Sequence, residues 1–119
     1  MMKKLIVLSA LLVAGMAQAV GITVQNKSSK TLTVKMFYNN NKNTITKSIA
    51  PTKQQDFDTG FHSIDAMSWQ EPNNGSTFKL NHKIPGINIG PLLTIYNDGQ
   101  CDMRDCLGCP NPRMNAAKQ

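Results

Sequence analysis

The sequence predicts an all-β protein, a small antiparallel β-sandwich of the immunoglobulin-like or a similar kind with about six to seven strands. Three observations predict this fold. Apolar and polar residues alternate along most of the chain after residue 20, which is typical of strands that bury one face. Turn-forming residues recur about every ten positions. No segment after residue 20 has the pattern of a convincing helix.

Residues 1–19 have the three parts of a secretory signal peptide. Two lysines near the start precede an apolar run over residues 5–16, and the small residues Ala17 and Ala19 flank Gln18. We expect cleavage after Ala19 and export by the Sec route, which makes the mature protein periplasmic or secreted. The apolar run is shorter than the roughly 20 residues of a spanning helix, so we expect no transmembrane segment after cleavage. An uncleaved N-terminal anchor is the alternative.

The remaining chain is expected to form one domain. About 100 residues are enough for a single hydrophobic core and too few for two. We assign residues 20–100 to the sandwich and residues 101–119 to an irregular, Cys-rich C-terminal tail. No repeat of fixed period is visible.

Alternation gives the first three strands. Residues 22–25 form a short one, and residues 31–38 form the clearest in the chain. An asparagine-rich turn over residues 39–43 follows, because asparagine tolerates left-handed backbone. A third strand at residues 44–49 ends before Pro51, since proline cannot donate a hydrogen bond to a neighbouring strand.

The stretch over residues 57–69 is the expected centre of the core. It contains Phe57, Phe61 and Trp69, and Trp69 is the only tryptophan. Aromatic rings bury more area than aliphatic side chains, so three of them can dominate the core of a small domain. We therefore predict these three residues as core anchors.

Gly60 divides that stretch into two apolar runs. We predict a weak strand at residues 54–58, a hairpin corner at Gly60 and a strand at residues 64–69. The apolar spacing of the last segment also fits a helix, but its neighbours favour a strand. Asn74 and Gly75 form a strong turn signal. Two further strands are predicted at residues 77–84 and 92–96.

Two short features resemble known secreted proteins. The opening ITVQNKSSKTLTV and the step from Ile49-Ala50-Pro51 to Phe57 resemble small extracellular sandwiches of the immunoglobulin-like and aegerolysin-like kind. The resemblance implies a sandwich fold and brings no functional residue to this chain. Because no cysteine precedes Cys101, the inter-sheet disulfide of immunoglobulin domains is excluded.

The charge distribution argues against nucleic-acid binding. The formal net charge is +6, yet only Arg104 and Arg113 are arginines and the lysines are scattered along the chain. Nucleic-acid surfaces usually combine clustered cations with exposed aromatic platforms, and neither is present. We interpret the lysines as solvated strand faces and as protection of strand edges.

No catalytic constellation is recognisable. His62, Ser63 and Asp65 are close in sequence, but adjacent residues on a strand point to opposite faces and cannot form a relay. Asp56 and Asp58 share a strand face without an acidic loop, which makes a poor calcium site. We therefore expect neither enzymatic activity nor a cofactor.

All three cysteines lie in the tail, as Cys101, Cys106 and Cys109. The spacing matches three ligands of a plant-type iron–sulfur cluster, but the fourth cysteine is missing. In an oxidising compartment we expect a disulfide within this group, with Cys101 joined to Cys106 or Cys109. The odd thiol would then stay buried, react, or link two chains as a disulfide-bonded homodimer.

A soft-metal site is the alternative use of the same three thiols. Met103 and Met114 lie beside them in sequence, and thiolates with thioethers favour Cu(I). Addition of His62 or His82 would suit Zn²⁺.

The loop over residues 84–93 combines apolar residues with glycine and proline. Ile87 and Ile89 at its tip would form a small exposed apolar patch, and such patches mark partner contacts. The alternative is that both isoleucines fold back and close one end of the sandwich.

From these features we expect a small exported protein that acts by binding, with a protein, a glycan or a lipid surface as its partner. The alternatives are a periplasmic Cu or Zn binder that uses the tail, and a secreted host-facing or membrane-touching factor.

Overall fold

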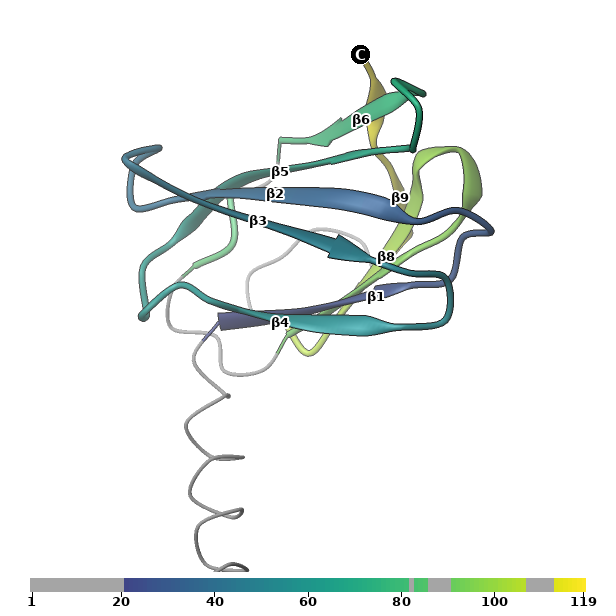
Figure 1. Ribbon diagram of the computed structural model, residues 1–119. Coiled ribbons are helices and arrows are strands. Elements are labelled where there is room, and N and C mark those ends of the chain that lie inside the picture. The colour runs from purple at the N-terminus through teal and green to yellow at the C-terminus, as the bar shows by residue number, and fades with distance from the viewer. Residues whose placement is uncertain (1–20, 82, 86–90, 107–112) are drawn as a thin grey trace, which may run out of the picture.

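The computed structural model describes residues 21–119 apart from 82, 86–90 and 107–112, and only the backbone of residues 113–115. Within these residues most of the regular structure is β-strand, arranged in two sheets that pack together (Figure 1). The predicted all-β sandwich is therefore confirmed.

Sheet A has the strand order β4-β1-β7-β8-β9. Its strands are β1 (Gly21–Asn26), β4 (Gln54–Asp58), β7 (Leu92–Ile95), β8 (Gln100–Arg104) and β9 (Arg113–Asn115). The neighbours β1 and β7 run parallel, whereas the other pairs of this sheet are antiparallel. This one parallel pair departs from the predicted antiparallel arrangement, because the two strands are far apart in sequence and no hairpin joins them.

Sheet B has the strand order β10-β6-β5-β2-β3, and all its pairs are antiparallel. Its strands are β2 (Leu32–Tyr38), β3 (Asn43–Ile49), β5 (Ile64–Gln70), β6 (Thr77–Leu80) and β10 (Ala117–Lys118). The strand predicted over residues 77–84 ends at Leu80, and Ile84 forms an isolated bridge with Ile64.

The prediction of an irregular C-terminal tail is wrong for the described residues of this segment, most of which are in the strands β8, β9 and β10. After the short 3₁₀ helix η1 (Asn97–Gly99), β8 pairs with β7 and places Cys101 and Met103 in the core. Polar and apolar residues alternate over residues 100–104, which is a strand pattern. Interpreting the cysteines as a disulfide or metal group left this pattern out of account. Among the described residues no helix is long and apolar enough to cross a membrane.

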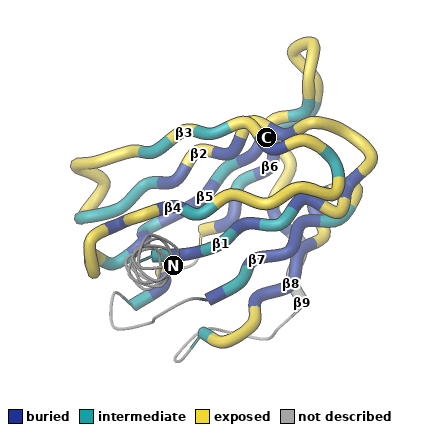
Figure 2. The backbone as a smooth tube through the Cα atoms, turned by 60° about the horizontal axis from the view of Figure 1, so that its bottom comes forward, coloured by how far each residue is buried: buried dark blue, intermediate teal, exposed yellow. Residues whose placement is uncertain are grey.

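The core lies between the two sheets, where buried residues alternate with exposed ones along the strands (Figure 2). Phe57 and Trp69 are each 1% exposed, so both predicted anchors are confirmed as core residues. Phe61 is 61% exposed, and its prediction as a core anchor is wrong. Gly60 lies in a turn that carries the chain from β4 in sheet A to β5 in sheet B, not in a hairpin, and this turn directs the Phe61 ring outward.

Asparagines shape the turns as expected. Asn39, Asn40 and Asn41 have φ values of 56°, 56° and 62° in the β2–β3 turn. Asn73 and Asn74 have positive φ values in the β5–β6 turn. Asparagine adopts this left-handed region more readily than most side chains, since its amide bonds to nearby backbone.

Asn26 has a different role, because its side chain is completely buried. The amide nitrogen donates to the carbonyls of Lys30 and Ile49, each at 2.8 Å. The amide oxygen accepts from the backbone N–H of Ser28 at 2.9 Å and from its hydroxyl at 2.6 Å. One amide thus joins the end of β1, the β1–β2 turn and the end of β3.

Lys47 covers the side of the sandwich where the edge strands β3 and β4 face each other. Its ammonium donates to the carbonyl of Asp56 at 2.6 Å and lies 5.4 Å from the ring centroid of Phe57. A charged side chain that points inward from an edge strand hinders pairing with another chain.

Candidate functional site

The site is built around the turn between β4 and β5, residues 59–63, which we call the Phe61 corner. The N–H of His62 donates to the carbonyl of Thr59 at 3.1 Å and closes the turn. Both central residues have positive φ, 60° at Gly60 and 66° at Phe61. The N–H of Gly60 also donates to the Asp58 carboxylate at 3.0 Å, which fixes the entry to the turn.

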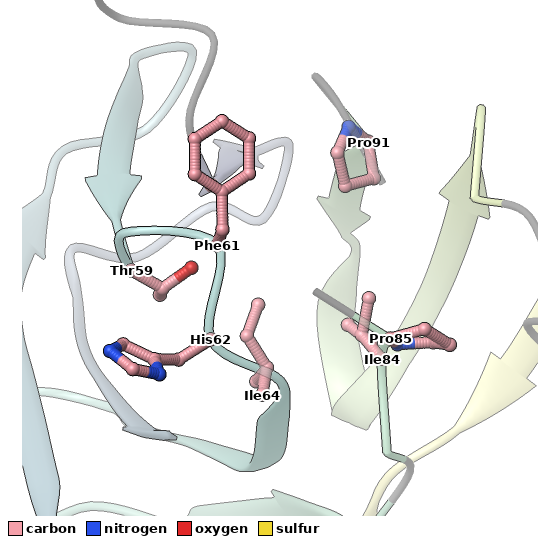
Figure 3. Close-up of a pocket in the computed structure, with 8 residues that line it drawn as sticks. Thr59, Phe61, His62, Ile64, Ile84, Pro85 and Pro91 are labelled. Carbon is pink, nitrogen blue, oxygen red and sulfur yellow. The ribbon is translucent and has the colours of Figure 1, made fainter. Parts of the chain in front are cut away.

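Phe61 is exceptional in two respects. Positive φ is unfavourable for a bulky L-residue, and an aromatic residue there is a genuine outlier. Phe61 is also the one large hydrophobic residue that is exposed in the described part of the chain. Figure 3 shows its ring projecting from the corner, away from the His62 ring.

A second loop supports the Phe61 corner. In the β2–β3 turn the N–H of Asn39 donates to the carbonyl of Ser63 at 3.1 Å. The N–H of Asn41 donates to the Asp65 carboxylate at 2.8 Å. The rings of Tyr38 and His62 lie 6.4 Å apart at a tilt of 35°. These contacts tie the two turns at this end of the sandwich into one unit.

A small hollow lies beside the corner. Its lining combines the corner with β1, β5 and the segments around Ile84 and Pro91 (Figure 3). The hollow has a volume of about 10 Å³, which is room for about one water molecule. Pockets for small-molecule ligands are typically about 300–1,000 Å³, so a ligand would contact the outer surface of the corner.

His62 of the corner and the nearby Asp65 on β5 have structural contacts that do not form a relay. The Asp65 carboxylate accepts from the backbone of Asn41, and His62 packs against Tyr38 on the exposed side. A nucleophile, a base and an orienting acid must follow one another in hydrogen-bond contact. Instead, Asp65 is bonded to the β2–β3 turn and His62 lies against Tyr38 at the end of β2.

Cys101 does not form the disulfide that the sequence predicts, because it is a free thiol. The reason is its position on β8, where it points into the core and is 0% exposed. Cys106 lies half-buried against the same core, and Cys109 lies outside the described residues. A covalent dimer through Cys101 would require the sandwich to open.

The surroundings of Cys101 also oppose metal binding. Burial raises the pKa of its thiol from 9.0 to about 11, and the neighbouring Asp102 carboxylate contributes further. Metals bind the thiolate, so a raised pKa weakens the ligand. Met103 is a buried core residue, His82 lies outside the described residues, and the side chain of Met114 is among those not described. In the described part of the chain no three His, Cys, Asp or Glu side chains are grouped as a metal site.

The Cys101 thiol should make stability depend on pH in alkaline solution. The unfolded chain begins to lose the thiol proton near pH 9.0, whereas the folded protein holds it until about pH 11. Ionisation therefore favours the unfolded chain, and the free energy of unfolding should fall by on the order of 2 kcal/mol across this window. Urea unfolding at pH 8 and pH 11, compared with Cys101→Ala, measures this contribution. An equal decline in the variant would exclude the thiol as its source.

The other predicted contact residues, Ile87 and Ile89, lie outside the described residues. Partner contact through this loop therefore stays a prediction. Sequence reasoning missed Phe61 as a surface residue because a phenylalanine between short strands normally indicates core. The available signal was Gly60 directly before it, which allows a tight turn but does not show which way the next side chain points.

Comparisons with known proteins add no family assignment. No family model matches the chain, and no curated protein or solved structure matches it.

Proposed function

We propose that this protein is a small exported binding protein that acts without catalysis, and that the Phe61 corner contacts its partner. The observation that carries the proposal is an aromatic side chain that is 61% exposed on a residue with φ of 66°. Left-handed backbone costs an L-residue about 1–2 kcal/mol. An unfavourable conformation that displays an apolar ring to solvent is typical of residues selected for contact.

The hydrogen bonds of the corner support this role. The turn is closed by His62, its entry is held by Asp58, and the neighbouring β2–β3 turn is bonded to it. A backbone that is already held in place loses less conformational entropy on binding. Exposed aromatic residues also contribute a large share of binding energy at protein interfaces. The partner that best suits the corner is a protein with an apolar pocket for one ring.

Export follows from the sequence pattern of residues 1–19, which we interpret as a signal peptide. In an oxidising compartment we propose a disulfide between Cys106 and Cys109. The free, buried state of Cys101 supports this pairing, because it leaves those two cysteines with each other.

Photo-crosslinking from residue 61 tests the contact. Replacement of Phe61 by a photoreactive phenylalanine derivative, in the cells that produce the protein, should give a discrete covalent adduct with one partner. The same replacement at Asn73, an exposed turn residue with φ of 58°, should give none. Identical adduct patterns at both positions, or no adduct at residue 61, would contradict the proposal.

Phe61→Gly provides an independent measurement on the same residue. Glycine adopts positive φ without steric cost, so the free energy of unfolding should rise by up to about 1 kcal/mol. The partner recovered by crosslinking should no longer bind the variant. A gain in stability together with a loss of binding would show that Phe61 serves binding and not folding. Retained binding would exclude Phe61 as the contact residue.

A further inference from the structure

The outer face of sheet B carries a second feature, which is independent of the Phe61 corner. The half-buried ring of Phe37 on β2 has two ammonium groups close to it. The Nζ of Lys35 is 5.3 Å from the ring centroid, and the Nζ of Lys79 on β6 is 5.7 Å from it. Both distances are within the range of cation–π contacts.

The strand register explains how these residues meet. Lys35 on β2 lies opposite Ser68 on β5, and Ser68 lies opposite Lys79 on β6. Phe37 follows Lys35 on the same face, opposite Thr44 on one side and Ala66 on the other. Hydroxyl side chains occupy the surrounding positions of this face, at Thr33, Thr44, Thr46, Ser48, Ser68 and Thr77.

No carboxylate pairs with the two ammonium groups, those of Lys35 and Lys79, among the described residues. Among the residues of β2, β3, β5 and β6 the one carboxylate is that of Asp65, which accepts a hydrogen bond from Asn41 at the end of the sandwich. Two cations held at one ring without a carboxylate leave a positive potential that an anion would neutralise.

We infer that this face binds an acidic polysaccharide. Its sugar rings would lie along the hydroxyl-bearing strands, with an acidic group placed between Lys35 and Lys79. The hydroxyl-bearing positions extend over several neighbouring strands. Serine and threonine hydroxyls can donate to and accept from sugar hydroxyls, and the two ammonium groups complement the negative charge.

The same observations disfavour a membrane or a nucleic acid as the occupant. Phe37 is half-buried, and no large apolar side chain is exposed among the described residues of this face. Insertion into a lipid interface depends on exposed apolar area. Nucleic-acid sites combine several phosphate contacts with stacking platforms, and this face offers two lysines and one partly covered ring.

Polygalacturonate is a suitable probe, because its fully methyl-esterified form has the same backbone without charge. Purified protein should bind immobilised polygalacturonate at an ionic strength of about 0.15 M and should not bind the ester. Equal binding to both polymers, or binding to neither, would overturn the inference. Tighter binding to phosphatidylserine vesicles or to duplex DNA would also overturn it.

Matched lysine variants locate the binding face. K35Q/K79Q should lower the affinity for polygalacturonate at least about tenfold. K27Q/K53Q removes the same charge at two exposed positions away from this face and should stay within about twofold. K35R/K79R keeps both charges and should bind polygalacturonate like the unmodified protein. Circular dichroism checks that each variant folds. Equal losses in the two glutamine variants would show that only net charge matters and would overturn the assignment.

Discussion

Replacement of Trp69 by alanine should lower the free energy of unfolding by about 3–5 kcal/mol. The indole is 1% exposed on β5, where its neighbours in the register are Val34 on β2 and Phe78 on β6. Loss of the ring removes a large buried apolar area and leaves a cavity between the sheets that the sandwich cannot fully close. Domains of this size have a total stability of about 5–15 kcal/mol, so the variant would be close to unfolding.

Urea unfolding followed by far-ultraviolet circular dichroism measures this change without the indole as a probe. Phe61→Ala is the matched control, because it truncates an aromatic ring that is 61% exposed. The control should stay within about 0.5 kcal/mol of the unmodified protein. A loss below about 1 kcal/mol for Trp69→Ala would show that this residue is not the centre of the core.

Asn26→Asp should destabilise the protein by about 3–5 kcal/mol, although the two side chains have nearly the same shape. The buried amide nitrogen donates to two carbonyl oxygens, those of Lys30 and Ile49. A carboxylate cannot donate, so it would place a buried charge against both of these acceptors. The joint between β1, the β1–β2 turn and β3 would therefore open.

The pH dependence of this variant identifies the cause. Burial beside two carbonyls should raise the pKa of the introduced carboxyl above its unfolded value, and the protonated form can donate to one carbonyl. The loss should therefore be smaller near pH 4 than at pH 7, since a raised folded pKa removes stability as the pH rises. Asn73→Asp makes the same change at an exposed turn residue and should leave stability within about 0.5 kcal/mol at both values. A similar effect at both positions would contradict the assigned role of Asn26.

Much of the fold could be predicted because alternation and turn chemistry are local. The strand β2 and the asparagine turn after it depend on residues adjacent in sequence, and both are present where expected. The parallel pairing of β1 with β7 could not be predicted in this way. It joins segments about 70 positions apart, and nothing in either strand encodes the direction of its neighbour.

The candidate site was less predictable for a related reason. Burial of Phe57 follows from its place in a strand, but exposure of Phe61 depends on a turn that passes from one sheet to the other. For Cys101 the error was the reverse, because the sequence predicted a disulfide or metal-binding residue and the structure places it in the core on β8. The meeting of Lys35 and Lys79 at one ring requires the register of three strands, which the sequence alone does not specify.

The proposed contact requires that the Phe61 corner hold an exposed aromatic residue in a fixed, left-handed conformation before any partner arrives. Nitrogen-15 relaxation of the isolated protein measures this through the backbone order parameter of the Phe61 amide. We predict a value of about 0.85, equal to that of the core strands. A value below about 0.6 would show that the corner moves freely and would contradict the claim.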